Sequence, residues 1–473
     1  MENKKLFTLS EAAKWCGGTV KGEDCTVASA EIDSRSVTNI PGVMFVALKG
    51  ENTDGHNYID KAFENGAECV LCEKEAEGKS ILLANDSLKA LGDIAKGFKE
   101  NKRNIKKTVA VTGSVGKTTT KEFLASVFST TYKTHKTEGN YNSVIGLPLT
   151  VFNIEPDTEA AVFEMGMSAK GEIEAMVDIA YPDGAIITNI GTSHMEMLGS
   201  RENILKAKLE ITKHFGKDNI LVLNGDDPYL LSEKEKTVPY RRIYASLFNE
   251  ESDFVGKNVV FSHDGVTYDI YIKEKNITVT DVRIPAVGMH NVYNSLLVFA
   301  LSYLMGISVD NIKDGLMNYK TTGMRQKIYD VGNYTIMADC YNASPESVKA
   351  SSEALVRLAR DKKVSSHAVL GEMRELGAAS ASLHRQTGKN VYENGVDHLY
   401  LWGTNASLIG EGAIEAGMRC ERVFTFSDGC DYNELTAKLA ENIKDGDIIM
   451  FKASRYVKLE NAIENFEGYL KCE

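Results

Sequence analysis

A glycine-rich turn between an apolar strand-like run and a helix-like run limits the possible folds more than any other part of the chain. Residues 108–111 read Thr-Val-Ala-Val, and residues 112–118 read Thr-Gly-Ser-Val-Gly-Lys-Thr. In α/β proteins such a turn places backbone N–H groups and a helix N-terminus around phosphate oxygens. The general phosphate loop has a further glycine five residues before Gly116, where this chain has Val111, so the match is to a shorter form. A chance turn rich in glycine and threonine is the alternative, but it does not account for the strand before the turn and the helix after it.

Each position of this loop has an expected role in holding a nucleotide. Lys117 is expected to reach the β and γ phosphates, and the hydroxyl of Thr118 to hold Mg²⁺. The neighbouring groups complete the predicted nucleotide site: Gly113, Ser114, Val115, Gly116 and Thr119.

The rest of the chain alternates between strand-like and helix-like stretches. Strand-like runs lie at 108–111, 160–163, 184–189 and 220–223, and again at 334–338, 367–370, 398–401, 423–426 and 447–451. Between these two series lie a β-rich run over 254–287 and an apolar helix that begins near 291. Such alternation is typical of parallel sheets with helices on both faces.

A chain of 473 residues is too long for one core, so several domains are expected. Two mostly polar segments, 99–107 and 316–326, are interpreted as linkers. We therefore predict an α/β protein of three domains. A less regular α/β domain covers 1–104, a central P-loop ATP-binding domain with a mostly parallel sheet covers 105–320, and a Rossmann-like domain covers 321–473.

Composition and the absence of targeting signals exclude several classes of protein. The net charge of −12 argues against a nucleic-acid binder. The first seven residues lack the apolar region of a signal peptide, and the apolar run at 296–307 is too short to span a membrane. Cys69 and Cys72 lie in an apolar run and are read as buried, reduced thiols rather than a zinc site. We therefore expect a cytoplasmic protein without membrane insertion.

Three further side chains are candidates for holding metal near the phosphates. Glu164 ends an apolar strand, and His194 follows a neighbouring strand of the same predicted sheet. Lys208 falls inside the apolar arc of a predicted helix over 201–215, so it must lose its proton, find a partner or be modified. The hypothesis is a carbamate on Lys208 that serves a second Mg²⁺. The alternatives are an isolated acid at a strand end, a surface histidine and a lysine whose tip reaches solvent.

The phosphate loop followed by Glu164, His194 and Lys208 resembles the central domain of the Mur ligases. These enzymes join amino acids or dipeptides to UDP-N-acetylmuramoyl peptides, and the resemblance covers essentially the whole chain. The other stretches that carry it are 33–35, 45–50, 54–56, 139–148, 288–294, Arg325 with 339–345, and 371–377 with His384. Two positions depart from the usual family pattern: Ala453 stands where glycine is usual, and Ser344 where asparagine is common.

The resemblance implies an ATP-dependent ligase of peptidoglycan precursor synthesis. It implies a UDP-sugar-binding N-terminal domain, an acyl-phosphate intermediate, and the addition of D-alanyl-D-alanine to a UDP-N-acetylmuramoyl-tripeptide. A monomer is expected, although the sequence leaves the oligomeric state open. Lys117, Glu164, His194 and Lys208 would be catalytic. Further nucleotide contacts would come from Asn291, Asn294, Arg325 and Asp339. Substrate contacts would come from Ser34, Arg35, Lys49, Gly50, Asp54, Gly55, His56, Asn140, Asn142, Tyr341 and Asn342.

Some assignments stay open at the level of sequence. Arg35, Lys49 and N–H groups near Gly50 and Gly55 are suited to a diphosphate, or else form an ordinary turn cluster. The candidates for gripping D-alanyl-D-alanine are Arg374, Lys452 and Arg455. The alternative functions are a sister ligase that adds a diamino acid to a UDP-linked dipeptide, a folylpolyglutamate synthetase, and a non-catalytic P-loop sensor of UDP-linked peptides.

Overall fold

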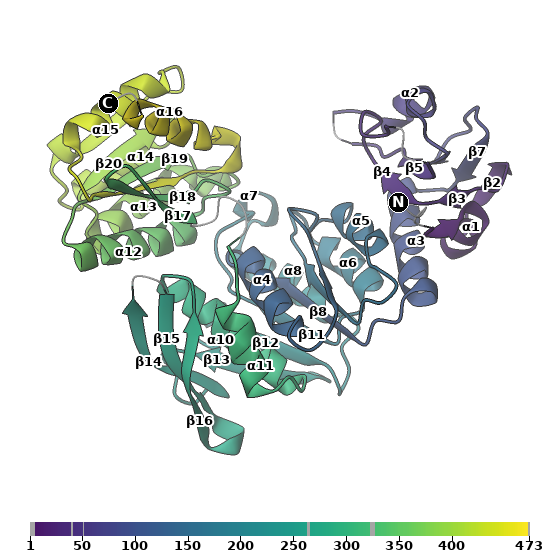
Figure 1. Ribbon diagram of the computed structural model, residues 1–473, viewed down its shortest axis with the longest axis horizontal. Coiled ribbons are helices and arrows are strands. Elements are labelled where there is room, and N and C mark those ends of the chain that lie inside the picture. The colour runs from purple at the N-terminus through teal and green to yellow at the C-terminus, as the bar shows by residue number, and fades with distance from the viewer. Residues whose placement is uncertain (1–4, 39–40, 51, 263–264, 322–326, 472–473) are drawn as a thin grey trace.

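Three lobes follow one another along the chain in the computed structural model, each built on its own sheet (Figure 1). The structure describes residues 5–38, 41–50, 52–262, 265–321 and 327–471. Over these ranges, every helix is too short or too polar to span a bilayer. The predicted fold class, α/β with mostly parallel sheets in three domains, is confirmed.

The N-terminal lobe contains a five-stranded sheet in the order β2-β7-β6-β5-β4. Only β2 runs antiparallel to its neighbour. A small antiparallel pair, β1 with β3, lies beside it. The strands are β1 (Phe7–Thr8), β2 (Thr19–Gly22), β3 (Thr26–Val27), β4 (Ser29–Glu31), β5 (Val43–Val46), β6 (Cys69–Cys72) and β7 (Ser80–Leu83). The helices are α1 (Leu9–Cys16), α2 (Ile59–Glu64) and α3 (Ser87–Lys102). Cys69 and Cys72 are buried in β6 as free thiols, as predicted.

The central lobe is built on a nine-stranded sheet in the order β16-β15-β14-β13-β12-β11-β8-β10-β9. It is parallel from β14 to β9, and β14, β15 and β16 add an antiparallel meander at one edge. The strands are β8 (Lys107–Thr112), β9 (Thr134–Lys136), β10 (Ala160–Glu164), β11 (Gly184–Ile187), β12 (Ile220–Asn224), β13 (Arg241–Ser246), β14 (Phe254–Ser262), β15 (Gly265–Ile272) and β16 (Ile277–Ile284). The helices are α4 (Lys117–Phe128), α5 (Gly146–Phe152), α6 (Glu172–Ala180), α7 (Met195–Leu198), α8 (Arg201–Leu209), α9 (Pro228–Leu231), α10 (Met289–Leu304) and α11 (Val309–Met317).

The C-terminal lobe is a six-stranded sheet in the order β17-β18-β22-β19-β20-β21, parallel except for the edge strand β17. The strands are β17 (Lys327–Val331), β18 (Tyr334–Asp339), β19 (Ser366–Gly371), β20 (His398–Trp402), β21 (Val423–Phe426) and β22 (Ile448–Lys452). The helices are α12 (Pro345–Lys362), α13 (Ser380–Asn394), α14 (Ser407–Glu415), α15 (Tyr432–Asn442) and α16 (Glu460–Leu470). Every strand-like run predicted in this part of the chain corresponds to one of these strands.

Two local predictions differ from the structure. The segment 99–107 was expected to be a linker, but α3 continues to Lys102 because its buried face, which includes Ile94 and Phe98, anchors the last turns. The helix expected over 201–215 ends at Leu209 and continues as a short 3₁₀ turn, Glu210–Thr212.

Candidate active site

The phosphate loop joins β8 to α4, and a different steric contact requires glycine at each of its two glycine positions. Gly113 has φ +151°, and a Cβ there would lie 1.8 Å from Thr188 Oγ1. Gly116 has φ +84° at the start of α4, and a Cβ there would lie 2.7 Å from Asn294 Oδ1. Only glycine accepts both the backbone conformation and this close approach.

The end of the neighbouring strand β11 holds the loop in place. Asn189 accepts from the Val115 N–H at 3.0 Å and donates from Nδ2 to the Val115 carbonyl at 3.0 Å. Ser114 Oγ accepts from the Gly191 N–H at 2.8 Å. Lys117 Nζ donates to the Gly113 carbonyl at 2.9 Å, which keeps the ammonium group over the loop. The loop is therefore preorganised for an anion.

Glu164 ends β10 and faces the first turn of α4. Its Oε1 accepts hydrogen bonds from Thr118 Oγ1 at 3.0 Å and from Asn142 Nδ2 at 2.7 Å. Its Oε2 is buried and has no hydrogen-bond partner in the part of the chain that the structure describes. The ammonium group of buried Lys121 lies 4.0 Å from that oxygen. Buried carboxylate and hydroxyl oxygens beside a phosphate loop are a donor set suited to Mg²⁺.

Lys208 points into the protein, as the helical periodicity predicted. Its side chain is 1% exposed, and burial together with the nearby charge of Lys117 holds the pKa of Lys208 well below its ordinary value. An amine in this state is nucleophilic, so the environment is compatible with reaction with carbon dioxide.

His194 lies at the start of α7 with a left-handed backbone, φ +64°. Its Nδ1 is 2.7 Å from Oε2 of Glu375, which belongs to the C-terminal lobe. This hydrogen bond lowers the pKa of Glu375. The ring therefore keeps Nε2 for other contacts.

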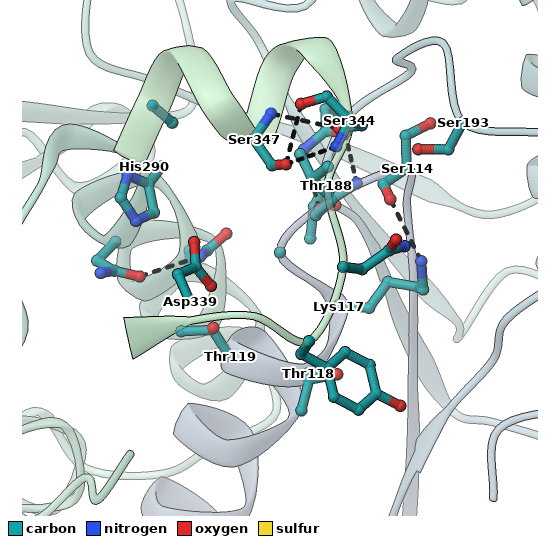
Figure 2. A pocket seen from close by; sticks show the side chains of 18 of the residues that line it. Ser114, Lys117, Thr118, Thr119, Thr188, Ser193, His290, Asp339, Ser344 and Ser347 are labelled. Carbon is teal, nitrogen blue, oxygen red and sulfur yellow. Dashed lines mark hydrogen bonds between the residues drawn. The ribbon is translucent and has the colours of Figure 1, made fainter. Parts of the chain in front are cut away.

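A cavity of about 670 Å³ lies where the central and C-terminal lobes meet (Figure 2). The phosphate loop and the start of α4 form one wall, and the end of β18 with the start of α12 forms the opposite wall. It is lined by every predicted residue of the loop except Gly113, and by Asn142, Glu164, His194, Asn291, Asn294, Asp339, Tyr341 and Asn342. Asn140 and Lys208 are not among the lining residues, and neither is any described residue before 105. Arg325 lies outside the described residues.

A buried ion pair lies in the cavity wall that the C-terminal lobe forms. Lys452 Nζ donates to Asp339 Oδ2 at 2.7 Å and to the Asn342 carbonyl at 2.9 Å, and both charged side chains are largely buried. Ser351 also donates to Asp339, at 2.8 Å. Ser344, which departs from the family pattern, caps α12 by accepting from the Ser347 N–H.

The three cations proposed to grip a dipeptide are separated in the structure. Lys452 lines the cavity, but Arg374 and Arg455 do not. The guanidinium of Arg374 lies 4.4 Å from the ring centre of Tyr456, and Arg455 pairs with Glu460 at 2.6 Å. Of the three, only Lys452 is placed to touch a molecule in the cavity.

The N-terminal candidates form a separate cluster in which several groups already have partners. Arg35 is exposed but bonded to Asp33 at 2.9 and 2.7 Å, and hydrogen bonds from Arg35 lower the pKa of Asp33 to about 2. His56 Nδ1 lies 2.6 Å from Asp54 Oδ1, and its Nε2 accepts from the Glu73 N–H at 3.0 Å. The side chains of His56 and Asp54 therefore stabilise the conformation of their own loop.

The backbone N–H groups of the two glycines in this cluster also have partners within the chain. The N–H of Gly50 donates to the Thr53 carbonyl and the N–H of Gly55 to the Leu48 carbonyl, each at 2.8 Å. Both N–H groups are therefore already bonded, and the side chains of Arg35 and Lys49, the two candidate cations of this cluster, are exposed. Ser34 is buried, and its carbonyl accepts from Asn65 at 2.7 Å.

Sequence reasoning missed three charged residues around the site. Lys121 is 1% exposed, and Nζ donates to the Thr137 carbonyl at 2.7 Å and pairs with Glu122 at 2.7 Å. Its helical spacing from Leu124 and Phe128 signals that it lies on the buried face. Glu346 and Glu375 reach the central lobe from distant parts of the chain, and no local pattern identifies such contacts.

Comparison with known proteins agrees with this geometry. Three family models match: the Mur ligase family catalytic domain over 26–113, the Mur ligase middle domain over 111–302, and the Mur ligase glutamate ligase domain over 324–455. A relative from Bacillus subtilis strain 168 is 36% identical, with 98% of each chain covered. The chain therefore belongs to the Mur ligase family.

The similar proteins point to one member of that family. The relative from Bacillus subtilis is named UDP-N-acetylmuramoyl-tripeptide–D-alanyl-D-alanine ligase. So is one from Escherichia coli K12, 32% identical over 85% of this chain and 87% of its own. A crystal structure of MurF from Acinetobacter baumannii matches with a TM-score of 0.88 and 25% identity, covering 98% of this chain and 100% of that one. MurF ligase from Thermotoga maritima, solved in complex with ADP, matches with a TM-score of 0.80 and 31% identity over 94% and 98% of the two chains.

Proposed function

We propose that this chain is the ATP-dependent ligase that adds D-alanyl-D-alanine to a UDP-N-acetylmuramoyl-tripeptide during synthesis of peptidoglycan precursors. The observation that carries the proposal is the cavity between the lobes. There the phosphate loop and Glu164 face the Asp339–Lys452 pair of a second domain. The fold and the full-length relatives with this name support the same activity.

The chemistry follows from the poor reactivity of a carboxylate toward an amine. The terminal carboxylate of the tripeptide attacks the γ-phosphorus of ATP, which forms an acyl phosphate and releases ADP. The amine of D-alanyl-D-alanine then attacks the acyl carbon, inorganic phosphate leaves, and the amine loses a proton. Bringing two anions together is the main barrier, and Lys117 with the N–H groups of the loop offsets their repulsion.

Mg²⁺ fits the oxygen donors of the central lobe. Glu164 Oε2 is buried without a hydrogen-bond partner among the described residues, and Thr118 Oγ1 lies next to the same carboxylate. When bound, Mg²⁺ would neutralise phosphate charge. We infer two sites, one at Thr118 and Glu164 and one served by His194 and a carbamate on Lys208. Since the described residues hold no cluster of three or more His, Cys, Asp or Glu suited to a metal, both sites would need phosphate oxygens as well.

The remaining predicted residues divide between the two ends of the substrate. Arg35 and Lys49 would bind the UDP end at the N-terminal lobe, where both are exposed. Asn140 and Asn142 lie in the loop between β9 and α5, and Asn142 donates to Glu164, so this loop would contact the peptide end. Asn291, Asn294 and Asp339 would hold the nucleotide, with Lys452 fixing Asp339.

An isotope experiment tests the reaction path. The tripeptide substrate carrying oxygen-18 in its terminal carboxylate is incubated with ATP, Mg²⁺ and D-alanyl-D-alanine. One labelled oxygen is expected in the released phosphate, because the carboxylate oxygen stays with the phosphoryl group when the amide forms. Label retained wholly in the peptide product contradicts the acyl-phosphate path. ADP release that does not depend on the dipeptide contradicts the proposed ligase activity itself.

A further inference from the structure

Two residues with left-handed backbones meet across the interface between the central and C-terminal lobes. His194 has φ +64° and Glu375 has φ +66°, and the ring Nδ1 lies 2.7 Å from the carboxylate Oε2. Such φ values are uncommon for residues other than glycine and persist only where the surroundings hold them. The pair therefore joins two constrained backbones from different domains.

The C-terminal lobe fixes the loop that presents Glu375. The Met373 N–H donates to Nε2 of buried His384 at 3.1 Å. The Arg374 N–H donates to Ser454 Oγ at 3.0 Å, and the Ser454 N–H donates back to the Glu372 carbonyl at 3.1 Å. The segment before Glu375 is thus tied to α13 and to the end of β22, so the carboxylate has a defined position.

The central lobe contacts the C-terminal lobe at two further points, one in this loop and one at α12. The Glu196 N–H donates to the Glu375 carbonyl at 3.3 Å. The Thr192 N–H and hydroxyl donate to the two carboxylate oxygens of Glu346, at the start of α12, at 2.8 and 3.2 Å. The segment that carries His194 is therefore held by two carboxylates of the C-terminal lobe.

We propose that Glu375 is a positioning residue that sets the orientation and tautomer of His194 once the C-terminal domain is docked. The carboxylate accepts a hydrogen bond from Nδ1–H. The Nε2 lone pair is then left to face the cavity that His194 lines. The site on the central domain is then complete only when the C-terminal domain is in place. This inference rests on the proposed ligase function and adds a positioning residue to it.

Because the Glu375 side chain is exposed, its replacement can change activity without changing stability. The Glu375 side chain is 57% exposed, and exposed ion pairs contribute little to stability. Glu375→Ala should therefore fold with an unchanged melting temperature, since alanine keeps the Cβ and the same backbone restriction. Glu375→Gln keeps an oxygen acceptor at the same reach. Glu393→Ala is the matched control, because Glu393 is 56% exposed in a surface pair on α13.

Three measurements decide the proposal. Steady-state phosphate release should show kcat lowered about 10- to 100-fold by Glu375→Ala, with the KM for ATP changed less than about threefold, and most of kcat restored in Glu375→Gln. Calorimetry with a nonhydrolysable ATP analogue should show unchanged affinity, because Glu375 does not line the cavity. ¹⁵N-histidine NMR, with His194→Gln identifying the signal, should show the Nδ1–H tautomer in the wild type and its loss in Glu375→Ala.

The outcomes separate this inference from the proposed function. Dipeptide-dependent phosphate release by the wild type tests the function alone, and its failure removes the function. If the wild type is active, then an unchanged kcat or an unchanged His194 tautomer in Glu375→Ala overturns only the positioning role. A tenfold loss of analogue affinity overturns it as well, because Glu375 would then be a nucleotide contact.

Discussion

A buried lysine beside a phosphate site is the residue on which the proposed metal chemistry most depends. Lys208 is enclosed by α8 and its neighbours, and the pKa of its amine is lowered by burial and by Lys117. Burying a charged ammonium without compensation is costly, so the neutral amine is favoured. A neutral amine can add carbon dioxide, which converts a potential cation into an anionic oxygen ligand.

Replacing Lys208 should separate its chemical role from its structural one. Lys208→Met is expected to fold, because methionine suits an apolar position, and to lose about 10²- to 10³-fold in kcat through the missing anionic ligand. The checks are phosphate release, the melting temperature, and ¹³C NMR with labelled bicarbonate, in which the wild type alone should give a carbamate signal. Lys206→Met on the exposed face of the same helix is the control and should be neutral. Wild-type activity in Lys208→Met would exclude the carbamate.

The positions of some side chains in the fold could be predicted from the sequence, and those of others could not. The burial of Lys208 followed from helical periodicity, and the position of Glu164 followed from the rule that parallel strands end at the ligand side of a sheet. The partner of His194 could not be predicted, because Glu375 comes from another domain through a loop with a left-handed backbone. The hydrogen bond from the Glu73 N–H to His56 was not visible in the sequence either, because only the tertiary fold brings these two residues of the N-terminal lobe together.

Secondary-structure elements were predictable where their cores are apolar. The parallel strands are buried on both faces, so they read as continuous apolar runs, and all the runs named in the sequence correspond to strands. Boundaries were less accurate, as the extension of α3 into a polar segment shows. The polar residues at 99–102 complete the last turn of a helix whose other face is buried, and tertiary packing overrides their composition.

Strands β19 and β20 carry two stacked histidines, and the buried one, His367, links stability to pH. His367 is fully buried, its Nε2 lies 3.1 Å from Asp447, and its ring stacks on His398 with ring centres 4.7 Å apart. Burial, reinforced by the neighbouring His398, lowers the pKa of His367 to about 4. In the unfolded chain the pKa is about 6.5, so between these two values the unfolded state binds more protons than the folded state.

The sign of this linkage gives a testable pH dependence. The stability contributed by neutral His367 is fully present above pH ~6.5 and is lost as the pH falls toward 4. Between pH 7 and 5 the free energy of unfolding of the C-terminal domain should fall by about 2 kcal/mol from this group. Urea denaturation at each pH, monitored by hydrogen exchange of the amides in β19, measures this free energy of unfolding. His367→Gln should remove the pH dependence that comes from His367. His214→Gln, at a partly exposed ion pair, is the control. Equal pH dependence in the wild type and His367→Gln would contradict the assignment.

At the scale of the whole molecule, the three lobes are not joined in the same way. One apolar core runs continuously from the N-terminal lobe into the central lobe, where Phe152 of α5 packs against Phe7 at 5.5 Å and Phe98 at 5.8 Å between ring centres. The C-terminal lobe has cores of its own and meets the central lobe largely through side-chain contacts such as Thr192–Glu346. The shared core therefore opposes motion of the N-terminal lobe relative to the central lobe.

Truncating one aromatic ring should reveal this unequal coupling. Phe152→Ala is expected to reduce the free energy of unfolding by about 3–5 kcal/mol, because it leaves a cavity in a close-packed core. The loss should be shared by two lobes, so hydrogen exchange should rise in α1 and α3 as well as in α5. Phe466→Ala, which removes a buried ring that packs against Phe451, should cost a similar amount but raise exchange only in the C-terminal lobe. If exchange in α1 and α3 stays at the wild-type level in Phe152→Ala, the first two lobes are independent bodies.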